Sequence, residues 1–337
     1  MVTPLLQVEN VSKRFGSPPA LSERIAERLA GRSGGSAQPR IVHAVDRVSL
    51  TMGRGEVLGL VGESGCGKST LGRIMTGILP PSDGRVLLQG GPLMSAGRRP
   101  VKIDRQVQMV FQNPFASLNP RMPIGRAIAE GPIRHGLVAA RGAGAYVAGW
   151  LQRVGLDPAY ANRYPHQFSG GQRQRIAIAR ALAMQPSVLV CDEPVASLDV
   201  SIQAQIVNLF LALKEDLALT MLFISHDLGV VRHLCDRVAV MYLGRIVEIA
   251  DAAALYASPR HPYTRALLDS VPKLRLDSSA ASFRAIAGEL PSPLAPPAGC
   301  HFHARCPSAE DRCRVSAPAL VEIGGGHRVA CHLVPAG

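Results

Sequence analysis

Short apolar runs alternate with amphipathic stretches along most of this chain. The runs have the length of single strands, and two amphipathic stretches, 201–217 and 228–235, are expected to be helices. A shorter helix is expected over 71–79. Strands that alternate with helices predict a mostly parallel, doubly wound sheet. The expected strands are residues 5–15 as an edge strand, "IVHAVDRVSLTM", "GEVLGLVG", Val107–Phe111, "SVLVCDE", "TMLFIS", "RVAVMYLG" and "RIVEIA".

Three segments depart from this alternation. Residues 17–40 are rich in Ser, Gly, Arg and Pro around "LSERIAERLA", a short helical patch, so we expect an insertion or a mobile loop there. Residues 115–165 contain helical patches broken by Gly and Pro, which predicts an inserted helical subdomain. From about Pro259 onward Pro, Gly and Ser increase, and the linker "ELPSPLAPPAGC" leads into a tail that carries four cysteines.

Composition narrows the classes of partner. The formal net charge is +12, which would suit nucleic acid, but Lys and Arg are spread along all 337 residues and aromatic residues make up only 4%. We therefore expect no nucleic-acid partner. No apolar run approaches the roughly 18 residues of a membrane span, and the N-terminal sequence lacks the pattern of a signal peptide. A cytoplasmic chain is expected, with any membrane role exerted through a partner.

The segment "GESGCGKST", Gly62 to Thr70, predicts a nucleoside triphosphate site. It fits G-x-x-x-x-G-K-[ST] between the apolar strand "VLGLV" and a helix, which is the context that this motif needs. Its glycines allow the backbone N–H groups to face phosphates, and the helix adds its positive end. Lys68 can reach the β- and γ-phosphates, and Ser69 can offer a hydroxyl to Mg²⁺. A plain glycine turn is the alternative, and the thiol of Cys66 has no assigned role.

Polar residues at the ends of other strands can complete such a site. Asp192 and Glu193 end "SVLVCDE", where α/β sheets place their ligands, so Asp192 is expected to hold Mg²⁺ and Glu193 to deprotonate the attacking water. Gln112 and His226 also follow strands and could contact a γ-phosphate or its water. A structural hydrogen-bonding role is the alternative for both of these residues.

The segment "FSGGQRQRIAIAR", Phe168 to Arg180, holds no carboxylate, His or Cys, so it offers no catalyst. Its serine and glycines precede a helix-forming run. Such a helix N-terminus with free backbone N–H groups can bind an anion.

Four cysteines crowd the tail with the spacing C-x5-C-x6-C-x17-C, at Cys300, Cys306, Cys313 and Cys331. Structural zinc usually uses tighter pairs, and the common ferredoxin runs are spaced differently. From the residues alone, an iron–sulfur cluster, zinc and metal-free thiols stay open. The spare zinc ligands would be His301, His303, His327 and His332.

Together these segments resemble an ATP-binding subunit of an ABC transporter. "GESGCGKST" is similar to Walker A, "SVLVCDE" to Walker B and "FSGGQRQR" to the ABC signature, in the family's order, over roughly residues 5–250. Within this family, the chain is most similar to the oligopeptide/dipeptide importer branch. The similar segments are "FQNPFASLNPRM", "CDEPVASLDVSIQAQIVNL", "HPYTRALL" and the tail "ELPSP…GCHFHARCP". The D-loop reads Ala-Ser-Leu-Asp, where most relatives have Ser-Ala-Leu-Asp.

The resemblance implies an α/β fold with a RecA-like P-loop NTPase core, an antiparallel β edge, an inserted α-helical subdomain at about 115–182 and a small Cys-rich C-terminal extension. Residues 1–257 would be the nucleotide-binding domain and 258–337 the extension. The expected function is ATP hydrolysis that energises oligopeptide or dipeptide import at the cytoplasmic face of the cell (inner) membrane. The alternatives are import of another solute such as nickel, a soluble ABC ATPase, and a metal-dependent redox sensor.

The resemblance also implies roles for individual residues. Gln112 matches the Q-loop, which also ligates Mg²⁺ with Ser69 and Asp192, and His226 matches the switch histidine. Phe15 matches the aromatic that stacks on adenine, although an ordinary strand aromatic is the alternative. The signature of one chain would contact ATP bound to the other. The expected set is Glu193, His226 and Gln112 for catalysis; Phe15, Gly62, Glu63, Ser64, Gly65, Cys66, Gly67, Lys68, Ser69 and Thr70 for ATP; Ser169, Gly170, Gly171 and Gln172 for the partner's ATP; and Asp199 in the D-loop.

The resemblance implies partners and cofactors as well. The partners would be a homologous ATPase subunit in a heterodimer, two membrane permease subunits and an extracytoplasmic solute-binding protein. The coupling helices of the permease would dock on the helical subdomain near Gln112. ATP and Mg²⁺ are expected, and the tail's likeness to the branch favours a [4Fe–4S] cluster at Cys300, Cys306, Cys313 and Cys331, with zinc as the alternative.

Overall fold

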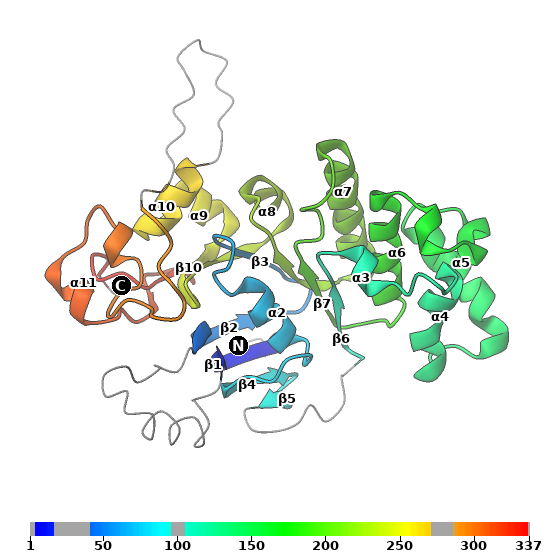
Figure 1. The fold of residues 1–337 in the computed structure, drawn as a ribbon, viewed down its shortest axis with the longest axis horizontal. Helices are drawn as coiled ribbons and strands as arrows, with labels where there is room; N and C mark the ends of the chain where they lie inside the picture. The colour runs from blue at the N-terminus through cyan, green and yellow to red at the C-terminus, as the bar shows by residue number, and fades with distance from the viewer. Residues whose placement is uncertain (1–3, 17–40, 96–104, 271–285, 287, 336–337) are drawn as a thin grey trace, which may run out of the picture.

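A computed structural model describes residues 4–16, 41–95, 105–270, 286 and 288–335. Two sheets organise the chain (Figure 1). The smaller sheet is antiparallel, in the order β2-β1-β4-β5. Its strands are β1 (Leu6–Phe15), β2 (Val42–Met52), β4 (Asp83–Leu88) and β5 (Gly91–Ser95).

The larger sheet has eight strands in the order β11-β12-β10-β9-β3-β8-β7-β6. The five strands from β9 to β6 are parallel, whereas β10, β12 and β11 continue the sheet antiparallel. The parallel strands β3, β7 and β8 are buried along their whole length, which explains their continuous apolar sequences. The strands are β3 (Val57–Val61), β6 (Val107–Val110), β7 (Val188–Asp192), β8 (Thr220–Ile224), β9 (Arg237–Tyr242), β10 (Arg245–Asp251), β11 (Val321–Glu322) and β12 (Arg328–Val329).

Helices cover both faces of the larger sheet. Helix α2 (Lys68–Met75) packs between the two sheets, where Leu71 and Ile74 join an apolar core with residues of β1 and β8. The opposite face is covered by α7 (Val200–Leu217), α8 (Leu228–Leu234) and α9 (Ala252–Ala257), whose buried side chains form a second core with β3 and β7. The parallel strands therefore end between two packed layers, and their ends lie beside the start of α2.

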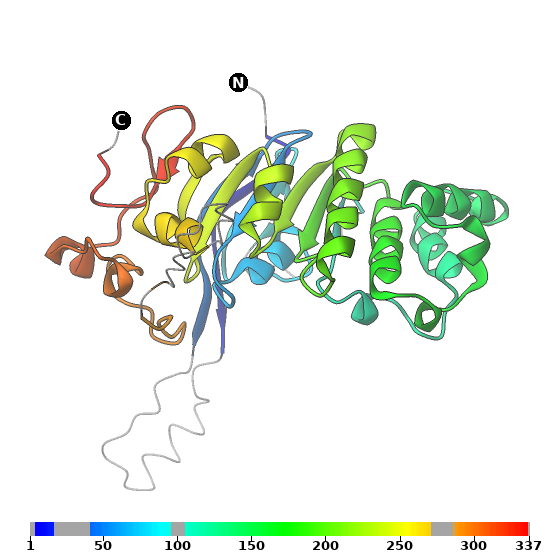
Figure 2. The same cartoon turned by 90° about the horizontal axis from the view of Figure 1, so that it is seen from above.

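A cluster of helices projects from one end of the molecule (Figures 1 and 2). It follows β6 in the chain and contains most of the segment between β6 and β7. Trp150, Leu151 and Ile128 join its helices in the second core. Its elements are α3 (Pro114–Ser117), α4 (Ile124–Arg134), η1 (Ala140–Gly142), α5 (Ala143–Arg153), η2 (Pro158–Asn162), η3 (Pro165–Gln167) and α6 (Gly170–Leu182).

The C-terminal segment is joined to the larger sheet. β12 pairs with β10, and the buried Glu248 of β10 accepts hydrogen bonds from the backbone N–H groups of Arg260 and His261 at 2.7 and 2.9 Å. Nε2 of His327 lies 2.7 Å from the same carboxylate. The remaining elements are α10 (Pro262–Asp269), η4 (His303–Arg305) and α11 (Asp311–Val315).

The expected strands are all present, but two details were wrong. Residues 5–15 do not form an edge strand, because β1 lies between β2 and β4. The helix expected over 71–79 begins at Lys68 and ends at Met75, because Gly77 takes a φ of 76°, which a continuing helix does not allow. The insertion expected at 17–40, with its helical patch, lies outside the described residues.

Candidate functional site

The loop between β3 and α2 has a backbone that only glycine tolerates. Gly62, Gly65 and Gly67 adopt φ angles of 153°, 78° and 109°. A Cβ atom on Gly62 would lie 2.1 Å from the carbonyl oxygen of Met241, and one on Gly67 would lie 2.1 Å from that of Ala44. The loop therefore packs closely between β9 and β2, and a side chain at Gly62 or Gly67 would push it away from these strands.

Lys68, Ser69 and Asp192 meet at the start of α2. Lys68 is 4% exposed, and its Nζ donates to the carbonyl oxygens of Gly62 and Glu63 at 2.8 and 3.0 Å. Ser69 Oγ donates to Asp192 Oδ1 at 2.7 Å. Burial raises the pKa of Asp192, although the hydrogen bond from Ser69 opposes this shift. A hydroxyl beside a carboxylate at a helix N-terminus is a donor set that suits Mg²⁺.

Glu193, Gln112 and His226 converge although they come from three different strand ends. Gln112 Nε2 donates to Glu193 Oε2 at 3.0 Å, and His226 Nδ1 lies 3.3 Å from the same oxygen. Glu193 has a φ of 46°, an uncommon conformation for a residue other than glycine, and its N–H donates to the carbonyl of Ile224 in β8. This backbone turns the carboxylate away from β7 and toward the other two side chains. The cluster can orient and deprotonate a water molecule.

The segment that begins at Ser169 is the N-terminus of α6. Ser169 is exposed and caps the helix, because its Oγ accepts from the N–H of Gln172 at 3.3 Å while the Gln172 side chain accepts from the N–H of Ser169 at 3.0 Å. A Cβ atom on Gly171 would lie 2.5 Å from Cγ2 of Ile202 in α7, whereas one on Gly170 would make an ordinary contact with Leu198. Gly171 therefore allows α6 and α7 to pack closely.

The D-loop aspartate and the candidate adenine aromatic both lie at the surface. Asp199 caps α7 by accepting from the N–H of Ile202 at 2.9 Å, and that hydrogen bond lowers its pKa. The next residue, Val200, is 82% exposed. Phe15 ends β1 with 40% exposure, and Lys13 Nζ lies 5.2 Å from its ring centre. An exposed aromatic can receive a flat ring, whereas a core aromatic cannot.

The remaining residues expected to contact ATP follow the course of the loop. Ser64 and Gly65 are exposed at its tip, Cys66 is buried, and Thr70 lies in the first turn of α2. Glu63 differs, because its backbone N–H donates to the hydroxyl of Tyr263 at 2.9 Å.

Sequence reasoning missed the contacts that the C-terminal segment makes with this loop. Tyr263 and Arg305 both contact Glu63 from positions 200 and 242 residues away in the chain. The segment "HPYTRALL" was noticed, but no periodicity or spacing connects it with the phosphate loop. Only the fold brings these residues together.

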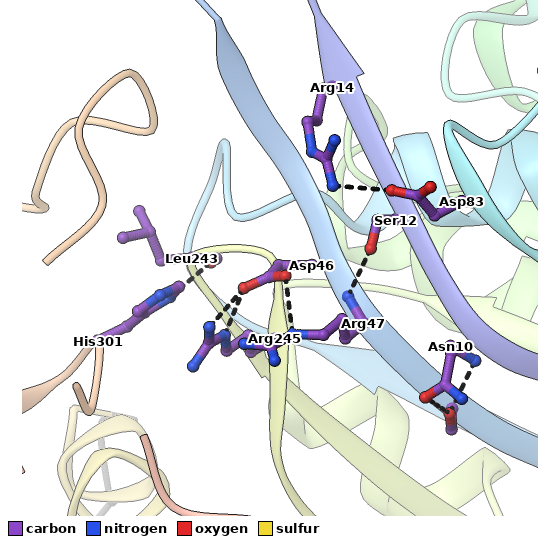
Figure 3. A network of polar contacts seen from close by, with 10 residues as sticks. Asn10, Ser12, Arg14, Asp46, Arg47, Asp83, Leu243, Arg245 and His301 are labelled. Atoms are coloured by element: carbon purple, nitrogen blue, oxygen red, sulfur yellow. Dashed lines mark hydrogen bonds and ion pairs between the residues drawn. The ribbon is translucent and has the colours of Figure 1, made fainter. Parts of the chain in front are cut away.

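A second set of polar contacts joins the turn after β9 to β2 and to the tail (Figure 3). Nδ1 of His301 lies 3.0 Å from the carbonyl oxygen of Leu243, and Nε and Nη2 of Arg245 lie 2.6 Å from Oδ2 of Asp46. The N–H of Gly244 in this turn donates to the carbonyl oxygen of Cys66 at 2.9 Å. The turn therefore contacts the phosphate loop on one side and the tail on the other.

The four tail cysteines are neighbours with free thiols. The N–H of Cys300 donates to the carbonyl of Cys313 at 2.9 Å. Burial raises the pKa of Cys300 to about 11, and the nearby Cys313, Cys331 and Cys306 add to the shift. Across the described part of the chain, however, no three His, Cys, Asp or Glu side chains lie close enough to hold a metal ion. Nδ1 of His301 is engaged with the carbonyl oxygen of Leu243, so this nitrogen is not free to act as a ligand.

Two family models match the chain. The model described as "ABC transporter" matches residues 45–196, and the one described as "Oligopeptide/dipeptide transporter, C-terminal region" matches residues 247–313. The first covers the phosphate loop, Gln112, the α6 segment and Glu193. The second covers Tyr263, Arg305 and three of the four tail cysteines.

Curated relatives and solved structures agree with these matches. The chain is 51% identical to the oligopeptide transport ATP-binding protein AppF of Bacillus subtilis (strain 168), over 87% of this chain and 90% of that protein. It is 54% identical to a putative peptide import ATP-binding protein of Brucella abortus (strain 2308), over 87% of each. The structure of cbiO1 from Clostridium perfringens, part of the ABC transporter complex cbiONQ, superposes with a TM-score of 0.60 at 28% identity, covering 76% of this chain and 91% of that one. The described helices include no candidate for a membrane span.

Proposed function

The chain belongs to the ATP-binding subunits of ABC transporters, in the oligopeptide/dipeptide branch, and from this premise we propose how its residues bind and hydrolyse ATP. It is an ATPase that energises a peptide importer, a membrane-associated, peripheral subunit that works with membrane permeases and a substrate-binding protein. The single observation that carries the proposed mechanism is the convergence of Gln112 and His226 on the carboxylate of Glu193 beside the phosphate loop.

The phosphate loop holds the triphosphate. In the structure, Lys68 donates to carbonyl oxygens of its own loop, and it exchanges them for the β- and γ-phosphates when ATP binds. Ser69, Asp192 and Gln112 would hold Mg²⁺, which would neutralise charge on the phosphates. Phe15 stacks on adenine, since it ends β1 with an exposed ring.

Hydrolysis proceeds by in-line attack of water on the γ-phosphorus. Glu193 accepts one proton from the water as the new O–P bond forms, and the bond to the β–γ bridging oxygen breaks to leave ADP. Gln112 holds the carboxylate and the water in place. His226 contacts the same carboxylate and is 59% exposed, so it can reach the γ-phosphate and the partner subunit.

The site is completed by a second ATPase subunit. Ser169 is exposed and Gly170 is partly exposed at the N-terminus of α6, where the hydroxyl and the first N–H groups of the helix can bind the γ-phosphate of ATP on the other chain. The exposed Val200 beside Asp199 gives this face an apolar contact point. We expect the partner to be a homologous, different subunit, and each chain then contributes to both sites.

The permease docks on a groove of about 540 Å³ between β6 and the helical cluster. Phe111, which precedes Gln112, lines the groove, so a helix bound there is adjacent to the water-orienting amide. This position allows closure on ATP to move the permease helices. The side chains that line it include Phe111, Ile128, Arg134, His135, Arg180 and Met184. A permease bound here places the subunit on the cytoplasmic face of the membrane.

For the tail we propose a structural [4Fe–4S] cluster on Cys300, Cys306, Cys313 and Cys331, with zinc as the alternative. Its support is the proximity of the four thiols, and the side chains would have to move to form a ligand set. Anaerobic purification followed by iron and sulfide analysis tests it. Colourless protein without iron or sulfide contradicts the cluster, and stoichiometric zinc supports the alternative.

Glu193→Gln tests the mechanism. The amide retains the size of the side chain but cannot take a proton, so hydrolysis should fall by roughly 10²–10⁴-fold while ATP binding persists. The assay is ATPase activity and peptide uptake by the complete transporter in proteoliposomes. Glu215→Gln, the same substitution on the exposed side of α7, is the matched control. Near-normal turnover of Glu193→Gln would exclude this residue as the base.

The comparisons do not favour the alternatives. The relatives are named as an oligopeptide transport and a putative peptide import ATP-binding protein, which argues against a nickel importer, a soluble ABC ATPase and a redox sensor with incidental ATPase activity. Peptide uptake compared with nickel uptake in the same proteoliposomes distinguishes a peptide importer from a nickel importer. Loss of uptake in Glu193→Gln with an unchanged metal content argues against the redox sensor.

A further inference from the structure

Arg305 of the C-terminal segment binds the carboxylate of Glu63 in the phosphate loop. Its two terminal nitrogens lie 2.7 and 3.0 Å from the two carboxylate oxygens, which is a bidentate pair. The Arg305 side chain is 5% exposed and the Glu63 side chain 26%. A pair so little exposed is less screened by water and salt than an ordinary surface ion pair.

Tyr263 binds the same residue through its backbone. Its hydroxyl accepts the N–H of Glu63 at 2.9 Å, and its ring is fully buried against Tyr242 and Phe302. The N–H of Glu63 is therefore used within the protein. The C-terminal segment therefore fixes the loop at Glu63 through two contacts, one with the side chain of this residue and one with its backbone N–H.

The turn at Leu243 and Gly244 provides a third connection. His301 contacts the carbonyl of Leu243 (Figure 3). Gly244 donates to the carbonyl of Cys66, three residues beyond Glu63. Leu243 has a φ of 42°, so the turn is held in a conformation that its own residue disfavours. The tail thus contacts the loop directly at Glu63 and through this turn at Cys66.

We propose that the C-terminal segment is a positioning element of the ATP site, in which Arg305 neutralises the carboxylate of Glu63 so that the phosphate loop accepts a triphosphate. The inference rests on the proposed ATP site. A carboxylate within a phosphate loop repels the triphosphate. A guanidinium that forms a bidentate ion pair with this carboxylate neutralises its charge and holds it away from the triphosphate. Arg305 is a positioning residue and does not contact ATP.

The test measures MgATP binding to the full chain and the ATPase activity of the complete transporter. Arg305→Gln leaves the Glu63 charge uncompensated, so Kd and KM for ATP should rise roughly tenfold while kcat changes little. The rise should shrink in high salt. Adding Glu63→Gln to this variant should restore binding to within about twofold. Arg312→Gln removes an exposed pair with Glu310 in the same tail and is the control without effect.

The single variant Glu63→Gln keeps the proposal falsifiable if Arg305→Gln fails to fold. It should bind ATP more tightly than the unmodified chain, because the negative charge of the carboxylate is lost while the positive charge of Arg305 remains. Weaker binding would show that Glu63 is an ATP or Mg²⁺ contact and would overturn the proposal. The proposal would also be overturned if Arg305→Gln lowered kcat and the affinity for ATP by equal factors and Glu63→Gln did not restore them. Failure of the catalytic mechanism is seen separately, as retained hydrolysis by Glu193→Gln with normal ATP binding.

Discussion

Ser169→Asp separates the two-chain site from the chain's own nucleotide site. Ser169 caps α6 through its Oγ, and aspartate is an equally good cap, so the helix should keep its stability to within about 0.5 kcal/mol. The change instead places a negative charge at the exposed N-terminus of α6. The matched control is Ser169→Asn, which has the same shape, caps equally well and carries no charge.

The electrostatic cost follows from contact distance. Two unit charges of the same sign about 4 Å apart, such as the new carboxylate and the γ-phosphate, repel each other by about 4 kcal/mol at an effective permittivity near 20. Solvent that enters the interface between the two subunits reduces this repulsion. A loss of even about 2.7 kcal/mol corresponds to roughly a hundredfold fall in occupancy of the closed state. We therefore expect the ATPase activity of the complete transporter to fall by about a hundredfold or more with Asp, and by less than about tenfold with Asn.

The assay needs two measurements on each variant. MgATP binding to the isolated chain should be unchanged, because Ser169 serves the partner's nucleotide. Turnover of the complex, with an unmodified partner subunit, should fall only for the charged variant. Equal turnover of Ser169→Asp and Ser169→Asn, or lost binding in the isolated chain, would refute the two-chain site. Gly171→Asp is a poorer probe, since its Cβ would lie 2.5 Å from Ile202 and disturb the packing of α7.

Other predictions concern adenine binding, stability and pH. Phe15→Ala should raise KM for ATP about fivefold without lowering the unfolding midpoint, because the ring is 40% exposed. Glu248→Gln should lower the free energy of unfolding by about 2 kcal/mol in urea titrations, because one of the buried donors around it loses its acceptor; an unchanged value would contradict this. Burial lowers the pKa of His261 to about 4, so its neutral form is favoured by folding. The stabilisation by neutral His261 is fully present above about pH 6.5. As pH falls toward 4, the free energy of unfolding decreases from this cause by about 1.4 kcal/mol per pH unit, and His261→Gln should remove this part of its pH dependence.

Strand and motif predictions succeeded where the information was local. Runs such as "VLGLV" and "SVLVCDE" became the fully buried strands β3 and β7, since a strand covered on both faces needs apolar residues throughout. The phosphate loop was predicted because glycine conformation and a following helix are encoded within nine residues. The position of β1 was wrong because an alternating pattern does not reveal how many neighbours a strand has. The pairing of β12 with β10 could not be foreseen from two residues of weak strand character.

The candidate catalytic residues were identified singly, and the fold brought three of them together. Gln112, Glu193 and His226 each follow a different strand, and parallel neighbours in the order β8-β7-β6 bring those three ends to one edge. Local sequence therefore specified the phosphate loop, the acids and the capped helix at Ser169, because each depends on residues a few positions apart. Tertiary structure alone decided that Arg305 lies against Glu63, because a contact across 242 residues depends on how whole elements pack.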